Sequence, residues 1–151
     1  MAERKVYLHP GQVFVSPDPA EVTTVLGSCV AVCVFDRVGR RGGANHFLLP
    51  LCAGDGQSSA RFGNVAVRKL IERMLALGSL KQDLEAKVFG GACTVEALHR
   101  SDGHLGTKNA EVALRTLRQE GVPVVADDVG GRRGRRLVFR TDTGVALVRL
   151  I

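Results

Sequence analysis

An uninterrupted apolar segment, Val30–Phe35, is the feature that most constrains the fold of this chain. The segment contains three valines and no charged residue. A run of this kind is typical of a strand that is buried on both faces, whereas a half-exposed strand alternates apolar and polar residues. The segment is also far too short to cross a bilayer. A sheet with a central, fully buried strand is therefore expected, and no membrane-spanning segment is predicted.

The remaining pattern predicts a strand-rich chain with two main helices. The expected strands are 5–15 (broken at His9–Gly11), 30–35, 45–49, 84–89, 122–126, 137–140 and 145–148, and the expected helices are 64–78 and 109–119. The two helices are predicted from apolar residues that recur every three or four positions, and the last two strands from the turn Asp142–Gly144 between them. Residues 36–43 are expected to form a turn. These elements predict an α+β fold in which helices pack on a sheet.

Length and composition agree with one soluble globular unit. The chain has 151 residues, of which 45% are hydrophobic and 24% charged, so a single domain spanning 1–151 is expected. No apolar stretch follows Met1–Lys5, so no secretory signal is predicted and a cytoplasmic location is expected. In that compartment the four cysteines are expected to be free thiols.

The net charge of +6 permits an anionic partner, and the excess is concentrated in Gly131–Arg136. No aromatic residues are interleaved with these arginines, and no recognition helix or RNA-binding signature accompanies them. We therefore favour a solvated turn over a nucleic-acid contact, although a basic nucleic-acid-binding module is kept as an alternative.

Cys29 is the strongest candidate nucleophile. It follows the small residues Gly27 and Ser28 and comes directly before the buried strand. Such a turn can direct successive backbone N–H groups at one point, which is how an oxyanion pocket is assembled. The competing interpretation is a structural role, because cysteine is among the residue types most often buried.

His46 is the candidate base, because it begins the next predicted strand and a strand–turn–strand arrangement would bring it beside Cys29. Thr23 or Thr24 is expected to supply a hydroxyl that fixes the imidazole. A hydrogen-bonded core histidine is the competing interpretation. The cysteines and histidines lack the spacing of a chelating site, so no metal is predicted.

The chain resembles the chemoreceptor glutamine deamidase family of bacterial chemotaxis, CheD, through several motifs in a fixed order. The motifs are Leu26–Val32, Gly43–Pro50, Phe89–Ala92, Gly106–Asn109, Asp128–Gly131 and the terminal hairpin with Thr143–Gly144. Together they extend over nearly the whole chain. Val25 stands where some members have glycine, and Cys93 differs from the residue commonly found after the Gly-Gly-Ala turn.

The resemblance implies a cysteine hydrolase that converts receptor glutamines to glutamates without a cofactor. It places the nucleophile on Cys29, the histidine on His46 and the supporting threonine on Thr23, with Gly27 and Ser28 contributing backbone groups to the oxyanion site. The implied fold is a layered α/β sandwich like that of toxin-type glutamine deamidases. The implied partners are methyl-accepting chemotaxis receptors and, in some bacteria, the phosphatase CheC. A non-catalytic adaptor that binds receptor or CheC is the alternative.

Overall fold

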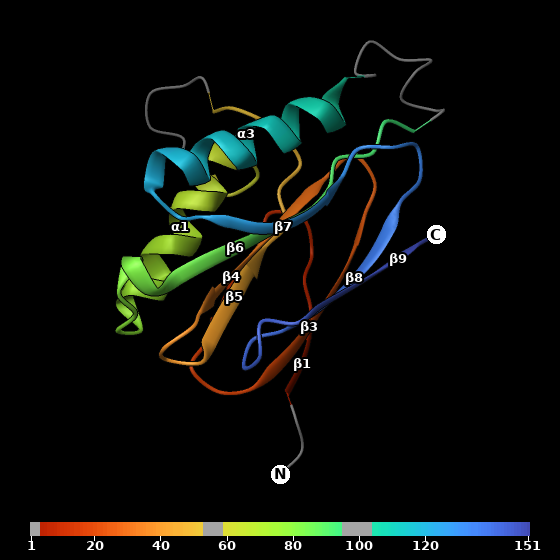
Figure 1. Cartoon of the computed structure of the whole chain (residues 1–151). Helices are drawn as coiled ribbons and strands as arrows, with labels where there is room; N and C mark the ends of the chain where they lie inside the picture. Colours follow the sequence, from red (N-terminus) through yellow and green to blue (C-terminus); the bar gives the residue numbers. More distant parts are fainter. Residues whose placement is uncertain (1–3, 53–58, 95–103) are drawn as a thin grey trace.

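Two β-sheets stack face to face, and two helices cover the outer side of one of them (Figure 1). The computed structural model describes residues 4–52, 59–94 and 104–151. In this part of the chain, one sheet has the strand order β1-β3-β8-β9 and the other has the order β2-β5-β4-β6-β7. Helices α1 and α3 pack against the five-stranded sheet. The expected α+β sandwich with two main helices is confirmed.

The first four strands alternate between the two sheets, the next three stay in the five-stranded sheet, and the last two return to the four-stranded sheet. Their bounds are β1 Arg4–Tyr7, β2 Val13–Ser16, β3 Ala20–Leu26, β4 Val30–Asp36, β5 Arg41–Asn45, β6 Leu84–Gly90, β7 Val124–Val129, β8 Arg135–Arg140 and β9 Ala146–Leu150. Helix α1 spans Gly63–Ala76, a 3₁₀ turn spans Lys81–Asp83, and α3 spans Leu105–Glu120. In the described residues, neither helix is long and apolar enough to cross a membrane.

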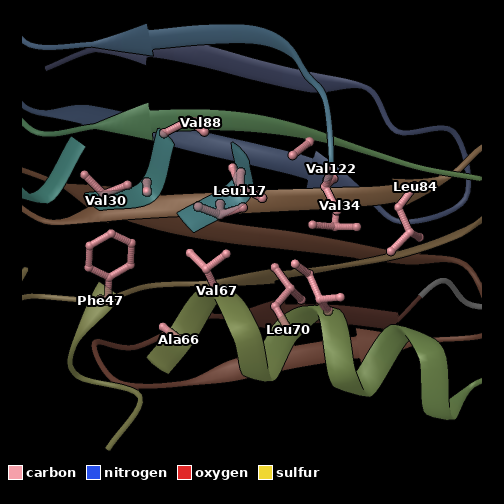
Figure 2. Close-up of a cluster of buried hydrophobic side chains, with 14 of the residues drawn as sticks. Val30, Val34, Phe47, Ala66, Val67, Leu70, Leu84, Val88, Leu117 and Val122 are labelled. Atoms are coloured by element: carbon pink, nitrogen blue, oxygen red, sulfur yellow. The ribbon is translucent and has the colours of Figure 1, made fainter. Parts of the chain in front are cut away.

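Strand β4 is buried on both faces, as predicted, because it lies between two hydrophobic layers. Successive side chains of a strand point to opposite faces. Val30, Val32 and Val34 enter the layer beneath the helices, which Figure 2 shows with Val67 and Leu70 of α1 packed nearby. The intervening side chains of β4, namely Ala31, Cys33 and Phe35, enter a second layer between the two sheets.

The N-terminal edge strand and the C-terminal hairpin are confirmed, with one refinement. The break at His9–Gly11 separates β1 from β2, and these two strands form edges of different sheets. Strands β8 and β9 pair antiparallel around a turn in which Gly144 has a φ of 75°, a value that favours glycine. The second helix begins at Leu105, four residues before the predicted start, and β7 extends to Val129.

The strand expected at 45–49 is displaced, because β5 ends at Asn45 and, beyond it, Phe47 and Leu49 form only isolated bridges. Two further predictions about the first half of the chain are wrong. Strand β3 was not predicted, because its buried positions include the polar Thr24 and its outward positions include the apolar Val25. The segment 36–43 is not a single turn, because β5 begins at Arg41 and contains Gly42–Gly43. A Cβ on Gly43 would lie 2.5 Å from the Phe14 carbonyl oxygen, so the glycine permits close approach of β2.

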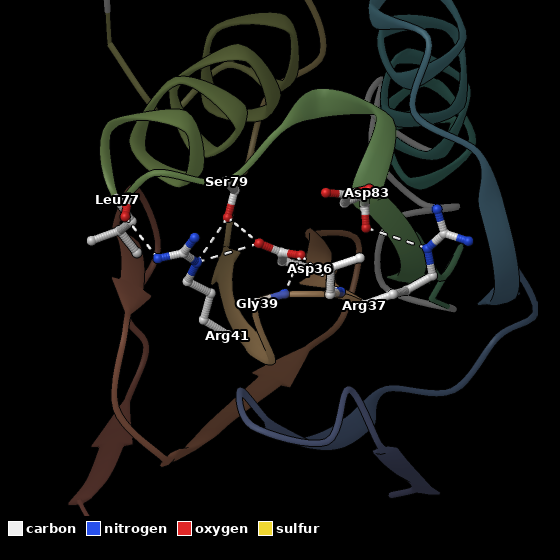
Figure 3. A network of polar contacts seen from close by, with 8 residues as sticks. Asp36, Arg37, Gly39, Arg41, Leu77, Ser79 and Asp83 are labelled. Carbon is white, nitrogen blue, oxygen red and sulfur yellow. Dashed lines mark hydrogen bonds and ion pairs between the residues drawn. The ribbon is translucent and has the colours of Figure 1, made fainter.

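At its C-terminal end β4 carries a buried carboxylate, Asp36, whose oxygens are all engaged (Figure 3). The hydroxyl of Ser79 donates to its Oδ2 at 2.6 Å, and the Arg41 Nε donates to the same atom at 3.3 Å. The N–H groups of Val38 and Gly39 donate to its Oδ1. This network ties the β4–β5 turn to the end of α1.

Candidate active site

Cys29 lies between β3 and β4, at the opposite end of β4 from Asp36. Its side chain is partly exposed and packs against the layer between the sheets. The backbone around it is fixed by the turn that follows β6: Gly91 N donates to the Cys29 carbonyl and Ala92 N to the Gly27 carbonyl, each at 2.9 Å. A Cβ on Gly90 would lie 2.2 Å from the Cys29 oxygen, so this turn requires glycine there.

The backbone N–H groups that precede Cys29 are not used by the fold. Within the described residues, the N–H groups of Gly27, Ser28 and Cys29 donate no hydrogen bond. These three residues are partly exposed, so an acceptor from outside the chain can reach them, and backbone N–H groups of this kind are a usual source of oxyanion binding. The expected oxyanion groups are thus free to bind an acceptor.

His46 follows β5 and is held in the sheet on both sides. Its N–H donates to the Gln12 carbonyl, and its carbonyl accepts from Gly11 N. On the other side, Val30 and Phe47 exchange two backbone hydrogen bonds, of 3.1 and 2.9 Å. These contacts extend the pairing of β5 beyond Asn45, so the histidine has the fixed backbone of a strand residue.

The pairing register places Cys29 and His46 on the same face. Since Val30 lies opposite Phe47, Ala31 lies opposite His46, and alternation puts the side chains of Cys29, Ala31 and His46 in the layer between the sheets. Cys29 and His46 are diagonal neighbours, a relation that typically separates Cα atoms by about 7–8 Å. In the described residues, His46 Nε2 is buried without a hydrogen-bond partner, so the thiol and the ring are neighbours that are not yet hydrogen-bonded.

Thr24 supplies the hydroxyl that contacts the imidazole. Its Oγ1 lies 2.7 Å from His46 Nδ1 and also donates to the Leu8 carbonyl at 2.7 Å. A hydroxyl has a single proton, so Oγ1 accepts a hydrogen bond from Nδ1–H while it donates to Leu8. This arrangement fixes the tautomer of His46, with the proton on Nδ1 and the lone pair on Nε2.

Thr23, the threonine that the resemblance indicated, is not the one that contacts His46. It is adjacent to Thr24 in β3 and therefore points to the opposite face of the four-stranded sheet, where it is partly exposed. The structure brings together Cys29, His46 and Thr24 at one end of the sandwich, and it places the Thr23 side chain outside this group.

Burial favours the neutral forms of both Cys29 and His46. Burial lowers the pKa of His46 to about 4, an effect that the nearby His9 reinforces and the Leu8 carbonyl opposes. Burial also raises the pKa of the Cys29 thiol. A resting thiolate–imidazolium pair is therefore disfavoured, and near pH 7 the site holds a thiol beside a neutral imidazole that can accept a proton.

Asn109 lies beside Cys29 and His46, and the sequence analysis named it within a motif without predicting a function for it. It lies one turn into α3 and is fully buried, and its Nδ2 donates to the carbonyls of Ser28 and Leu48, each at 2.9 Å. The amide thereby joins the segment before Cys29 to the segment after His46. Its Oδ1 has no hydrogen-bond partner in the described part of the chain.

Five of the six sequence motifs meet at one place, around Cys29 and the turn after β6. The sixth, the terminal hairpin, lies apart from them, since Gly144 packs on Phe35 near the other end of β4. Gly106, in the first turn of α3, packs so closely on the turn after β6 that a Cβ there would lie 2.3 Å from the Ala92 oxygen. Helix α3 and the turn after β6 thus fit together and support Cys29.

Comparison with known proteins agrees with this gathering of motifs. A sequence profile described as "CheD chemotactic sensory transduction" matches residues 48–150. A protein of Anaeromyxobacter dehalogenans named probable chemoreceptor glutamine deamidase CheD 1 is 51% identical over 145 residues, which cover 96% of this chain and 84% of that protein. Proteins of Trichlorobacter lovleyi and Sulfurimonas denitrificans, each named probable chemoreceptor glutamine deamidase CheD, are 44% and 40% identical, covering 96% and 100% of this chain and 89% and 97% of theirs.

Among solved structures, the hypothetical protein YfiH of Bacillus licheniformis is similar over 73% of this chain and 49% of that one, with 17% identity and a TM-score of 0.44. That similarity is too low to carry an argument about fold or site. The sequence relatives are decisive, since each is at least 40% identical and matches nearly the whole chain. This chain belongs to the CheD family.

Proposed function

We propose that this protein hydrolyses the side-chain amide of glutamine residues in chemoreceptors, with Cys29 as nucleophile and His46 as general base. The names of its relatives indicate the reaction class. The observation that carries the proposal is the state of His46. Its Nδ1–H is held by Thr24, and its Nε2 has no hydrogen-bond partner among the described residues, in the layer that also receives Cys29. The whole chain, 1–151, acts as one CheD-like domain.

In the first step, the Cys29 sulfur attacks the carboxamide carbon of the glutamine. Because the thiol is neutral at rest, its proton passes to His46 Nε2 as the carbon–sulfur bond forms. The imidazolium that results keeps its Nδ1–H on Thr24, so the ring need not rotate. The lowered pKa of His46 makes this imidazolium a strong acid, which suits it to return the proton.

The negative charge of the tetrahedral intermediate develops on the former amide oxygen. The N–H groups of Gly27, Ser28 and Cys29, which donate no hydrogen bond to the part of the chain that the structure describes, can donate to this oxygen. Donors of this type are worth roughly 10²–10³ in rate when one is lost. The hydrogen bonds from Gly91 and Ala92 hold the carbonyls of the same segment, so the donors are positioned before substrate arrives.

Collapse of the intermediate breaks the carbon–nitrogen bond, and His46 gives its proton to the departing ammonia. A thioester between Cys29 and the substrate remains. Water then attacks the thioester carbonyl and transfers a proton to Nε2, and the thiol is regenerated as the glutamate leaves. The net reaction consumes one water and releases one ammonia for each glutamine.

We assign the role of supporting hydroxyl to Thr24 rather than to Thr23, because Thr24 contacts the ring and Thr23 points to the other face of β3. Each event adds a negative charge to the receptor and creates a glutamate that reversible methylation can modify, so the reaction tunes receptor signalling and adaptation. A cytoplasmic location and an interaction with the phosphatase CheC are further parts of this proposal and rest on the family resemblance.

Intact-mass spectrometry of chemoreceptor cytoplasmic fragments incubated with the purified protein tests the proposal. The expected result is a mass increase that matches replacement of an amide by a carboxylic acid, together with stoichiometric ammonia release. Cys29→Ala is the matched inactive variant. Binding of the fragments without any mass change in the wild-type protein would instead support the non-catalytic adaptor and overturn the proposal.

A further inference from the structure

The outer face of the four-stranded sheet carries an exposed patch that has no part in the chemistry. Both helices lie on the far side of the other sheet, so no described helix covers this face (Figure 1). We define the outer patch as Val25, Arg136, Val138, Leu147 and Arg149, which alternate outward along β3, β8 and β9. Leu147 is 66% exposed and Val25 is 43% exposed.

Two arginines of the outer patch lie directly opposite each other. Arg136 of β8 pairs with Arg149 of β9 in the antiparallel register, and both are exposed. Like charges in this position destabilise a sheet. Within the described residues, neither guanidinium makes a hydrogen bond or an ion pair, so no carboxylate offsets the repulsion.

The other half of the same face is electrically balanced. Glu21 of β3 lies between Lys5 of β1 and Arg140 of β8 in the pairing registers, and Arg140 also pairs with Asp142 at 3.1 Å. The uncompensated positive charge is thus confined to the β8–β9 end. A general excess of basic residues does not explain this arrangement, because acids accompany the bases elsewhere on the face.

Apolar side chains and the two arginines together line a depression in the outer patch. A shallow depression of about 430 Å³ is lined by Arg136, Val138, Leu147, Val148 and Arg149. Val138 and Leu147 are direct cross-strand neighbours and form its aliphatic floor. A ligand that fits must offer carboxylates at the rim and an apolar side chain at the centre, because a guanidinium binds a carboxylate in bidentate fashion.

We propose that the outer patch is a docking surface for an acidic, partly apolar peptide segment of a protein partner. The aliphatic floor disfavours a single-stranded nucleic acid, which binds by stacking its bases on aromatic side chains. The patch lies on the opposite side of β3 from Thr24, so docking there leaves Cys29 open. This inference goes beyond the proposed reaction, and binding at the patch does not require turnover.

Fluorescence anisotropy with labelled peptides tests the docking surface on the full-length protein. The probes are a peptide of mixed Glu and Leu, a Lys and Leu peptide of equal length, a single-stranded DNA oligonucleotide and phosphatidylglycerol vesicles. The wild type is expected to prefer the Glu and Leu peptide. The double variant Arg136→Glu/Arg149→Glu is expected to weaken that binding at least about tenfold, as loss of two charge-assisted contacts implies.

Arg115→Glu/Arg118→Glu is the matched control, because it makes the same change in net charge at exposed positions of α3. It is expected to alter the affinity by less than about twofold. Iodoacetamide labelling of Cys29 should be equal in all three proteins, which shows that the fold is intact. Equal losses in both double variants, no binding of the acidic peptide, or tighter binding of DNA or vesicles would overturn the proposal.

Discussion

Buried polar groups lie at both ends of β4, and they differ in whether their hydrogen-bonding atoms have partners. At the Asp36 end, both carboxylate oxygens are engaged by Ser79, Arg41 and two backbone N–H groups. At the Cys29 end, His46 Nε2 and Asn109 Oδ1 are buried without partners in the described residues. The two ends belong to one strand, and the same hydrophobic layers border both.

This difference in hydrogen bonding distinguishes the structural role of the Asp36 end from the chemical role proposed for the Cys29 end. A buried polar group that is fully satisfied stabilises one conformation, whereas an unsatisfied one costs free energy unless a ligand completes it. The Asp36 network joins a turn to the end of a helix. The unpartnered atoms at the Cys29 end are those that a carboxamide and a reacting thiol are expected to meet.

The largest effect is expected from Cys29→Ala. Because the proposed thioester forms on the Cys29 sulfur, kcat for glutamine deamidation should fall by at least about 10³. The thermal midpoint should change little, since the side chain is only partly buried. Cys33→Ala is the control, because Cys33 lies in the buried layer between the sheets, and it should lower stability while the folded protein stays active. Undiminished ammonia release by Cys29→Ala would contradict the assignment.

His46→Gln is expected to lower kcat by about 10²–10⁴, the usual contribution of a general base. The same variant should also change the pH dependence of stability. Folded His46 has a pKa of about 4, below the ordinary histidine pKa of 6.5, so the unfolded state binds the proton first as pH falls. The wild type should lose about 3 kcal/mol from this source between pH 6.5 and 4.

The loss of stability should be smaller by this amount in His46→Gln, which lacks the titrating ring. Urea denaturation of both proteins at pH 7 and pH 4.5 gives the difference directly, and contributions from the carboxylates cancel in the comparison. Parallel stability curves for the two proteins would show that the ring is not buried in the neutral form.

Asn109→Ala is expected to have an intermediate effect through position rather than chemistry. Without the amide, the carbonyls of Ser28 and Leu48 lose their shared donor, and the segments that carry Cys29 and His46 separate. We expect kcat to fall by roughly tenfold, as expected when reacting groups are misplaced, with KM nearly unchanged. The rate of Cys29 alkylation should change in parallel, whereas a purely structural role would alter only the thermal midpoint.

The smallest effect on turnover is expected at the other end of β4. Asp36→Asn removes a buried charge that accepts several hydrogen bonds, so unfolding should become easier by about 2–4 kcal/mol. Burial opposes ionisation of Asp36, yet the bonds from Ser79, the backbone and Arg41 hold its pKa below the usual value. Its stabilising effect is thus present near neutral pH and lost in acid as the carboxyl protonates. At a temperature where the variant is folded, kcat should equal that of the wild type.

The sequence predicted much of the fold because its strongest signals are local. The apolar run of β4, the helical periodicity of α1 and the turn before β9 each depend on neighbouring residues. Strand β3 escaped prediction because Thr24 interrupts the apolar positions on its buried face. Thr24 is also the residue that contacts the His46 ring. The polar residue that obscures the strand pattern is therefore the one that the proposed function uses.

The site was predictable in part. Cys29 and His46 precede and follow strand segments that a short turn connects, and their shared face follows from simple alternation. The sequence could not show which of Thr23 and Thr24 contacts His46, because that depends on which face of β3 meets the second sheet. The role of Asn109 could not be predicted either, since the two residues it contacts, Ser28 and Leu48, precede it by 81 and 61 positions in the chain.

The protonation state of His46 tests the central claim most directly. Nitrogen-15 NMR of the folded protein reports the tautomer and the pKa of the ring in one titration. The account predicts a neutral ring near pH 7, with the proton on Nδ1, a lone pair on Nε2 and a midpoint near pH 4. A proton on Nε2 in the neutral ring, or a midpoint at or above 6.5, would contradict it.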